Sequence, residues 1–181
     1  SYLLDQYSGA SAAYSLRLLD CQYAGSAIRV RRNSDNTESD IGFVNGNLDT
    51  ATLKTFVGTG GTDDGFVVTW YDQSGNANNA IQGVASAQPK IMDNGSVMRT
   101  NNLPSLLFDV DLLSMTYSTT VTSQSTFAVF DNTSTATTYQ RVVSQFTGAT
   151  ETGGYIPLIF EGATSVFGSF TAGDMRSKIT L

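Results

Sequence analysis

Short runs in which apolar and polar residues alternate recur along the chain, and this period of two is typical of β-strands. The run Ala27–Arg32 predicts a strand with its apolar residues inward and its arginines on a solvated face. The most apolar run, Phe66–Tyr71, predicts a strand buried on both faces, with Val68 and Trp70 in the core. Further strands are expected at Ile41–Val44, Lys90–Met92, Ser105–Phe108, Thr126–Phe130, Arg141–Phe146, Tyr155–Glu161 and Val166–Phe170.

Two segments have the apolar spacing of a short helix. Ser11–Leu19 contains good helix formers with an apolar face, and Ser11 is a suitable N-cap. Thr50–Phe56 follows Asp49, a second suitable cap. Between the two segments, Asn45-Gly46 predicts a tight hairpin turn.

The composition supports a fold made of many strands and turns. Only 14% of the residues are charged, and Gly, Ser, Thr and Asn are abundant. Turn signals recur at spacings of about 8–12 residues, which suits a sandwich. We therefore expect one mostly β domain over residues 1–181, a jelly-roll β-sandwich with two short helices. Because Met175–Leu181 alternates like the start of a strand, we expect the C-terminal strands to be missing and the chain to be a fragment of a longer one.

Charge and residue content argue against several classes of partner. Sixteen acidic residues outnumber ten basic ones, so the formal net charge of −6 repels the phosphates of nucleic acids. No apolar stretch approaches the roughly 20 residues that span a bilayer, so membrane insertion is not expected. With one cysteine and no histidine, the sequence allows neither an internal disulfide nor a zinc site of the usual His/Cys type.

The loop after the most apolar strand contains the candidate ligand-binding residues. Loops that are held by a rigid scaffold often present hydrogen-bonding groups to a ligand, here a sugar. The candidates are Tyr71, Asp72, Gln73, Ser74 and Asn76, together with Tyr155 further along the chain. The alternative for Asp72 is an Asx-turn that caps its own loop, with Gly75 at positive φ, and the two roles are compatible. Trp70 is either a core residue or a platform for a sugar ring.

A second polar cluster raises the question of a metal ion. Asp35, Glu38 and Asp40, with Asn36, place oxygen ligands at close spacing, and calcium binds six to eight oxygens. Their spacing is not that of an EF-hand, and a solvated hairpin turn explains the cluster as well. We therefore expect no cofactor, with Ca²⁺ as the alternative.

Three stretches together resemble the catalytic domain of the α-L-arabinofuranosidases of glycoside hydrolase family 54. The first runs from Tyr14-Ser-Leu-Arg-Leu-Leu through Ile28-Arg-Val-Arg-Arg-Asn-Ser-Asp to Ser39-Asp-Ile-Gly42. The others are Trp70-Tyr-Asp-Gln-Ser-Gly-Asn-Ala-Asn-Asn79 and Phe127-Ala-Val-Phe-Asp131. The resemblance implies a concanavalin-A-like β-sandwich and, for the family, retaining hydrolysis by two carboxyl groups about 5–5.5 Å apart.

The chain departs from the resembling family at all three catalytic features. The family's nucleophilic glutamate, in a G-H-M-E-A-I-Y-F-G segment, corresponds to Pro157 in Gly154-Tyr-Ile-Pro-Leu-Ile-Phe-Glu-Gly162. Glu161 lies four residues later, roughly 13 Å along a strand, and is no simple substitute. The family's adjacent cysteine pair corresponds to Val142-Val143, and its acid/base Asp would lie beyond Leu181.

These departures favour a non-catalytic module. We expect carbohydrate recognition or adhesion, or a structural role, in a virion appendage such as a phage fibre or in a bacterial surface protein. The expected location is extracellular or on the virion surface, and the expected partners are a cell-surface glycan or polysaccharide and other subunits of a homo-oligomeric assembly. The alternative is a retaining glycoside hydrolase, α-L-arabinofuranosidase-like, that acts on polysaccharide with relocated carboxylates.

Overall fold

The computed structural model describes residues 1–58, 61, 63–116, 125–131, 139–145, 155–161 and 164–166, the last three ranges by their backbone only. By their internal contacts the residues form two units, Ser1–Thr119 and Thr120–Leu181, and each unit is described by itself. Whether the chain is one domain stays a prediction. The segment Met175–Leu181, on which the expected truncation was based, lies outside the described residues.

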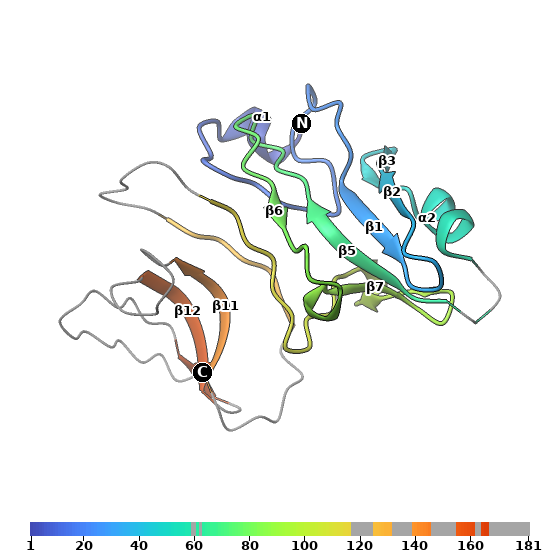
Figure 1. Cartoon of the computed structure of the whole chain (residues 1–181). Helices are drawn as coiled ribbons and strands as arrows, with labels where there is room; N and C mark the ends of the chain where they lie inside the picture. The colour runs from blue at the N-terminus through green and yellow to red at the C-terminus, as the bar shows by residue number, and fades with distance from the viewer. Residues whose placement is uncertain are drawn as a thin grey trace. The chain divides into compact units, whose positions relative to one another are not determined.

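The first unit contains a six-stranded antiparallel sheet (Figure 1). Five strands follow one another in the order β2-β1-β5-β7-β8, and β6 pairs with β5. Their bounds are β1 Ile28–Arg32, β2 Glu38–Ile41, β5 Gly65–Trp70, β6 Ala80–Ile81, β7 Lys90–Asp93 and β8 Ser96–Val97. The expected strands Ala27–Arg32, Phe66–Tyr71 and Lys90–Met92 lie within one residue of the bounds of β1, β5 and β7.

Smaller elements surround this sheet. They are the hairpin of β3 (Phe43–Val44) and β4 (Asn47–Leu48), the hairpin of β9 (Arg99–Thr100) and β10 (Leu103–Pro104), α1 (Leu3–Gln6), α2 (Thr50–Val57) and the 3₁₀ turn η1 (Ala85–Ala87). Asn45 and Gly46 have φ of 51° and 75°, as the predicted hairpin turn requires. Asp49 caps α2 by accepting the N–H of Thr52 at 3.0 Å, which confirms the predicted second helix.

The core of the first unit lies between one sheet face and α2, which Figure 1 shows beside β1 and β2. Leu53 and Val57 of α2 are buried with residues of the four strands β1, β2, β5 and β7, among them Ile28, Val30, Ile41, Val67, Ile91 and Met92. Gly65 permits this close approach, because a Cβ atom there would lie 3.0 Å from Cγ2 of Val57.

Two predictions about β5 were wrong: that it is buried on both faces, and that Val68 lies in the core. Its residues alternate between buried and half-buried, so one face is less buried than the other. Trp70 packs against the core as predicted, but Val68 is half-buried and Val67 is the fully buried valine. The ladder with β1 shifts register between the pairs Arg29–Thr69 and Val30–Val67, which leaves Val68 unpaired and puts Val67 on the core face.

The second unit contains a three-stranded antiparallel sheet in the order β11-β12-β13. The strands are β11 Tyr139–Gln145, β12 Tyr155–Glu161 and β13 Thr164–Val166. Pro157 lies where the β11–β12 register shifts, between the pairs Gln145–Tyr155 and Val143–Leu158. A proline has no N–H to donate to a ladder, so an irregularity of this kind is where a strand accommodates one.

The prediction of a mostly β fold with two short helices is confirmed, but the first helix was misplaced. Ser11–Leu19 forms no helix, because its backbone groups bond to Asp72 and Gln73 rather than to one another. The strand predictions at Ser105–Phe108 and Thr126–Phe130 were also wrong. The former contributes only a bridge between Leu107 and Lys90, and the latter forms no strand.

Candidate functional site

The carboxylate of Asp72 is a buried hydrogen-bond acceptor that joins two distant parts of the chain. Its Oδ1 accepts the N–H of Ala13 at 2.8 Å and that of Ser74 at 2.8 Å. Its Oδ2 accepts the Ser74 hydroxyl at 2.7 Å and the N–H of Asn78 at 3.0 Å. The bond to Ser74 N is the predicted Asx-turn, and Gly75 has the expected positive φ of 86°. With only 3% of the residue exposed, the carboxylate has a structural role.

Gln73 bonds to the same N-terminal segment and is 1% exposed. Its Oε1 accepts the N–H of Leu19 at 2.8 Å. Its Nε2 donates to the carbonyls of Ser15 at 3.0 Å and Arg17 at 3.1 Å, and its own backbone N–H donates to Ala13 O at 2.8 Å. Because one acceptor and both amide hydrogens are engaged, this side chain braces the segment instead of facing a ligand.

The remaining loop candidates continue this pattern. The Asn76 side chain donates to Ala10 O at 2.9 Å, and Ser74 is held by Asp72. Asn78, which was not among the candidates, donates to Ser11 O at 2.8 Å. Asp72, Gln73, Ser74 and Asn76 thus lie together in one loop, and their polar groups bond to residues 10–19. For Tyr155 the structure describes only the backbone, in β12.

Tyr71 is the loop candidate whose polar group points to a different, exposed cluster. Its hydroxyl donates to Oδ1 of Asp40 at 2.7 Å. Arg29 forms a bidentate ion pair with the same carboxylate, Nε to Oδ1 at 2.8 Å and Nη2 to Oδ2 at 2.9 Å. The side chains of Arg29 and Asp40 are 43% and 39% exposed, so solvent reaches both.

The electrostatics of this cluster fix its protonation states. The Arg29 hydrogen bonds, followed by the Tyr71 bond, hold the pKa of Asp40 below its ordinary value despite partial burial. Burial, and then the bond to Asp40, raise the pKa of Tyr71 to about 12. At neutral pH the cluster therefore contains a guanidinium, a carboxylate and a neutral phenol donor.

Sequence reasoning named Tyr71 but did not connect it with Arg29 and Asp40. A signal was present in the hairpin: once β1 and β2 are taken as antiparallel, Arg29 stands directly opposite Asp40. The local pattern alone suggested Asp40 only as a calcium ligand, and Arg29 only as part of a solvated basic face.

The prediction that the arginines of β1 face solvent is wrong for Arg31, which is only 7% exposed. Its guanidinium donates to Gln88 Oε1 at 2.8 Å and to Asn36 Oδ1 at 2.9 Å, and it lies 5.0 Å from the ring centre of Phe66. The Lys90 ammonium lies 5.5 Å from the same ring. Neutral acceptors and an aromatic face thus stabilise this buried charge, which anchors the chain near η1 to the sheet.

The three calcium candidates have different neighbours. Asp35 pairs with Arg32 at 2.7 Å and also accepts the Thr37 hydroxyl at 2.7 Å, whereas Asp40 pairs with Arg29. Glu38 stands opposite Arg31 in the β1–β2 ladder. Asp35, Glu38 and Asp40 do not form a group with ligand atoms close enough to hold one ion.

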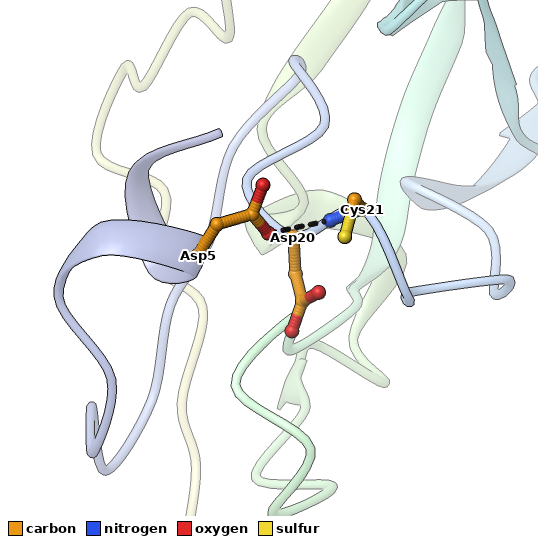
Figure 2. A group of neighbouring side chains, drawn as sticks. All are labelled: Asp5, Asp20 and Cys21. Atoms are coloured by element: carbon orange, nitrogen blue, oxygen red, sulfur yellow. Dashed lines mark hydrogen bonds between the residues drawn. The ribbon is translucent and has the colours of Figure 1, made fainter. Parts of the chain in front are cut away.

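A different group in the described residues has that spacing, namely Asp5, Asp20 and Cys21, whose ligand atoms lie within 4.8 Å of one another (Figure 2). Asp5 accepts the N–H of Cys21 at 3.0 Å and that of Tyr2 at 2.9 Å, which lowers its pKa. A side-chain hydrogen bond from the Cys21 thiol to Asp5 raises the pKa of that thiol. These carboxylate bonds tie α1 to the following loop, and the thiol stays protonated at neutral pH.

The mostly β fold with only two helices in the described residues agrees with the predicted β-sandwich. The sequence profile described as "Alpha-L-arabinofuranosidase B, catalytic" matches residues 7–166, which is most of the chain. The chain therefore belongs to this family, as the resemblance of its motifs implied. Comparisons with the curated proteins and with the solved structures gave no match. No helix in the described part of the chain has the length and apolar character that crossing a membrane requires.

Proposed function

We propose that this chain is a non-catalytic carbohydrate-recognition or adhesion module built on the arabinofuranosidase scaffold. The proposal rests on the resemblance of Gly154–Gly162 to the family's nucleophile segment, in which Pro157, in strand β12, stands in place of the glutamate. Proline has no group that can attack an anomeric carbon. The proposed setting is a virion appendage or a bacterial surface protein, extracellular, with a cell-surface glycan or polysaccharide as ligand and further subunits as partners.

The roles of the most specific family motif support a scaffold function. The side chains of Asp72 and Gln73 are buried and bonded to the N-terminal segment. Residues of this kind are needed to fold the sandwich whether or not it hydrolyses anything. The shared motif therefore supports a fold in common with the family, and it does not require that the chain perform the family's reaction.

The alternative, a retaining hydrolase with relocated carboxylates, needs two carboxyl groups about 5–5.5 Å apart and free to approach a sugar. Asp64 and Asp93 are a close pair, but both bind the ammonium of Lys90, at 3.0 and 2.7 Å. The Lys90 bond also lowers the pKa of Asp93. Because both carboxylates are engaged by the Lys90 ammonium, this pair is not a candidate for the nucleophile and the acid/base of a retaining hydrolase.

Binding to polysaccharide tests the proposal directly. Affinity electrophoresis through gels containing arabinoxylan, arabinan or no polysaccharide is expected to show retardation in a polysaccharide gel, while reducing-sugar assays of the same mixtures show no release. Retardation in no gel and no binding on a glycan array would contradict the proposal. That outcome would favour a purely structural fibre domain.

A further inference from the structure

On the proposed function, we infer that the glycan is held by the surface formed by Tyr23, Arg29, Asp40 and Tyr71, the tyrosine–arginine patch, and that the glycan it accepts is uncharged. The ligand then lies at the exposed end of strands β1, β2 and β5, and not at the Asp72–Asn76 loop. This assignment rests on the proposed function, and the experiment below can reject the patch without rejecting that function.

The polar groups of the patch are held in place before any ligand arrives. Arg29 and Asp40 stand opposite each other on neighbouring strands, and the bidentate pair fixes both side chains. Tyr71 directly follows β5, and its backbone N–H donates to Ala27 O at 3.0 Å. Groups locked on strands bind a ligand with a smaller loss of conformational entropy than groups on a mobile loop.

Aromatic surface adjoins these polar groups. The Tyr23 hydroxyl donates to Ser26 O at 2.9 Å, and the carbonyl of the next residue, Ala27, accepts the Tyr71 N–H at 3.0 Å, so the two tyrosines are held by the same short segment. The Tyr23 ring meets Phe43 edge to face, with centroids 6.3 Å apart. Rigid, half-buried tyrosine rings with engaged hydroxyls offer the apolar face on which a sugar ring packs.

The pairing of charges decides the class of glycan. Arg29 offers donors and Asp40 offers acceptors side by side, which suits neighbouring hydroxyl groups that both donate and accept. The two charges cancel within the patch, and the chain as a whole has a net charge of −6. A uronic acid or a sulfated sugar would meet Asp40 without a free counter-charge, so neutral sugars are favoured.

A matched pair of variants tests the assignment. Asp40→Ala removes the acceptor from the patch, and Asp35→Ala removes the other bidentate arginine–aspartate pair of the same hairpin, Arg32–Asp35, outside the patch. With soluble arabinoxylan as the neutral probe and polygalacturonate as the anionic one, Asp40→Ala is expected to weaken arabinoxylan binding at least about tenfold, the loss typical of a hydrogen bond to a charged group. Asp35→Ala should change it less than about twofold.

Arg29→Met provides a second variant if Asp40→Ala unfolds, and thermal unfolding of each variant controls for stability. Tighter binding of polygalacturonate than of arabinoxylan would overturn the uncharged class. Unchanged arabinoxylan binding by folded Asp40→Ala and Arg29→Met would overturn the patch while leaving the proposed function intact. If the wild-type protein binds neither probe nor any neutral glycan on an array, the proposed function itself fails.

Discussion

Asp72 accepts the backbone N–H of Ala13 at 2.8 Å, across 59 positions of the chain. This bond is one of a set through which a single loop replaces the helical bonds that Ser11–Leu19 would otherwise make. The Asp72–Asn76 loop, which the sequence suggested as a sugar site, therefore stabilises the fold.

Replacing Asp72 by alanine should therefore destabilise the protein strongly. The change leaves the N–H groups of Ala13, Ser74 and Asn78 without their acceptor, and each unsatisfied buried donor costs about 1–3 kcal/mol. We expect a loss of at least about 3 kcal/mol in the free energy of unfolding, measured by urea denaturation. Asp131→Ala, at an exposed position, is the control and should change it by less than about 0.5 kcal/mol. Equal effects of the two substitutions would contradict the structural role of Asp72.

Gln73→Glu tests the neighbouring residue with almost no change of shape. The new carboxylate loses the two N–H donors that bond to Ser15 O and Arg17 O and turns a negative charge toward those carbonyls. We expect a loss of at least about 2 kcal/mol in the free energy of unfolding at pH 7, part of which returns at low pH where the carboxyl is protonated. A Gln73→Glu variant as stable as the wild type at pH 7 would show that the amide donors are not needed.

Trp70 is expected to stabilise the core through its ring and not through its N–H. Its Nε1 is buried and has no hydrogen-bond partner among the described residues, and its ring lies 5.9 Å from that of Tyr14. Trp70→Phe should cost less than about 1.5 kcal/mol, whereas Trp70→Ala should cost about 3 kcal/mol, in chemical denaturation. If the two substitutions cost the same, the indole N–H contributes to stability through a partner beyond the described residues.

Acid should destabilise the protein in part through the carboxylates of the β1–β2 hairpin. Hydrogen bonds from Arg29 lower the pKa of Asp40, and those from Arg32 lower the pKa of Asp35, from an ordinary value of 3.8. The unfolded chain therefore binds protons at a higher pH than the folded one, so this stabilisation is fully present above about pH 5 and is lost as pH falls through the folded-state pKa values. Thermal unfolding between about pH 7 and pH 2 should show a falling Tm. In an Asp35→Asn, Asp40→Asn double variant the fall should be smaller, and an equally steep fall would assign it to other groups.

Local patterns were sufficient for the parts of the fold whose partners are near in sequence. The alternation of β1, the apolar run of β5, the Asp49 cap of α2 and the Asn45-Gly46 turn depend on neighbouring residues, and all were predicted. Ser11–Leu19 has a genuine helical pattern, and it failed because the competing acceptors and donors of Asp72 and Gln73 lie more than fifty residues away.

The candidate site shows the same limit. A sequence identifies Asp72 and Gln73 as polar loop residues, but only the folded chain shows that their groups face Ala13 and Leu19. Arg31 was placed in solvent because the pattern of β1 is alternating, yet its partner Gln88 lies 57 positions away. Burial of a charged side chain by such a distant segment leaves no periodic signal.

The most direct test of the account is an assay for hydrolysis under conditions where binding is saturated. The purified protein, incubated with an aryl α-L-arabinofuranoside and in parallel with a polysaccharide that it binds, is predicted to release aryl alcohol and reducing sugar at the rate of the buffer blank. Turnover above the blank that is abolished by Glu161→Gln would contradict the account, because a carboxylate outside the family position would then be performing the chemistry that Pro157 cannot.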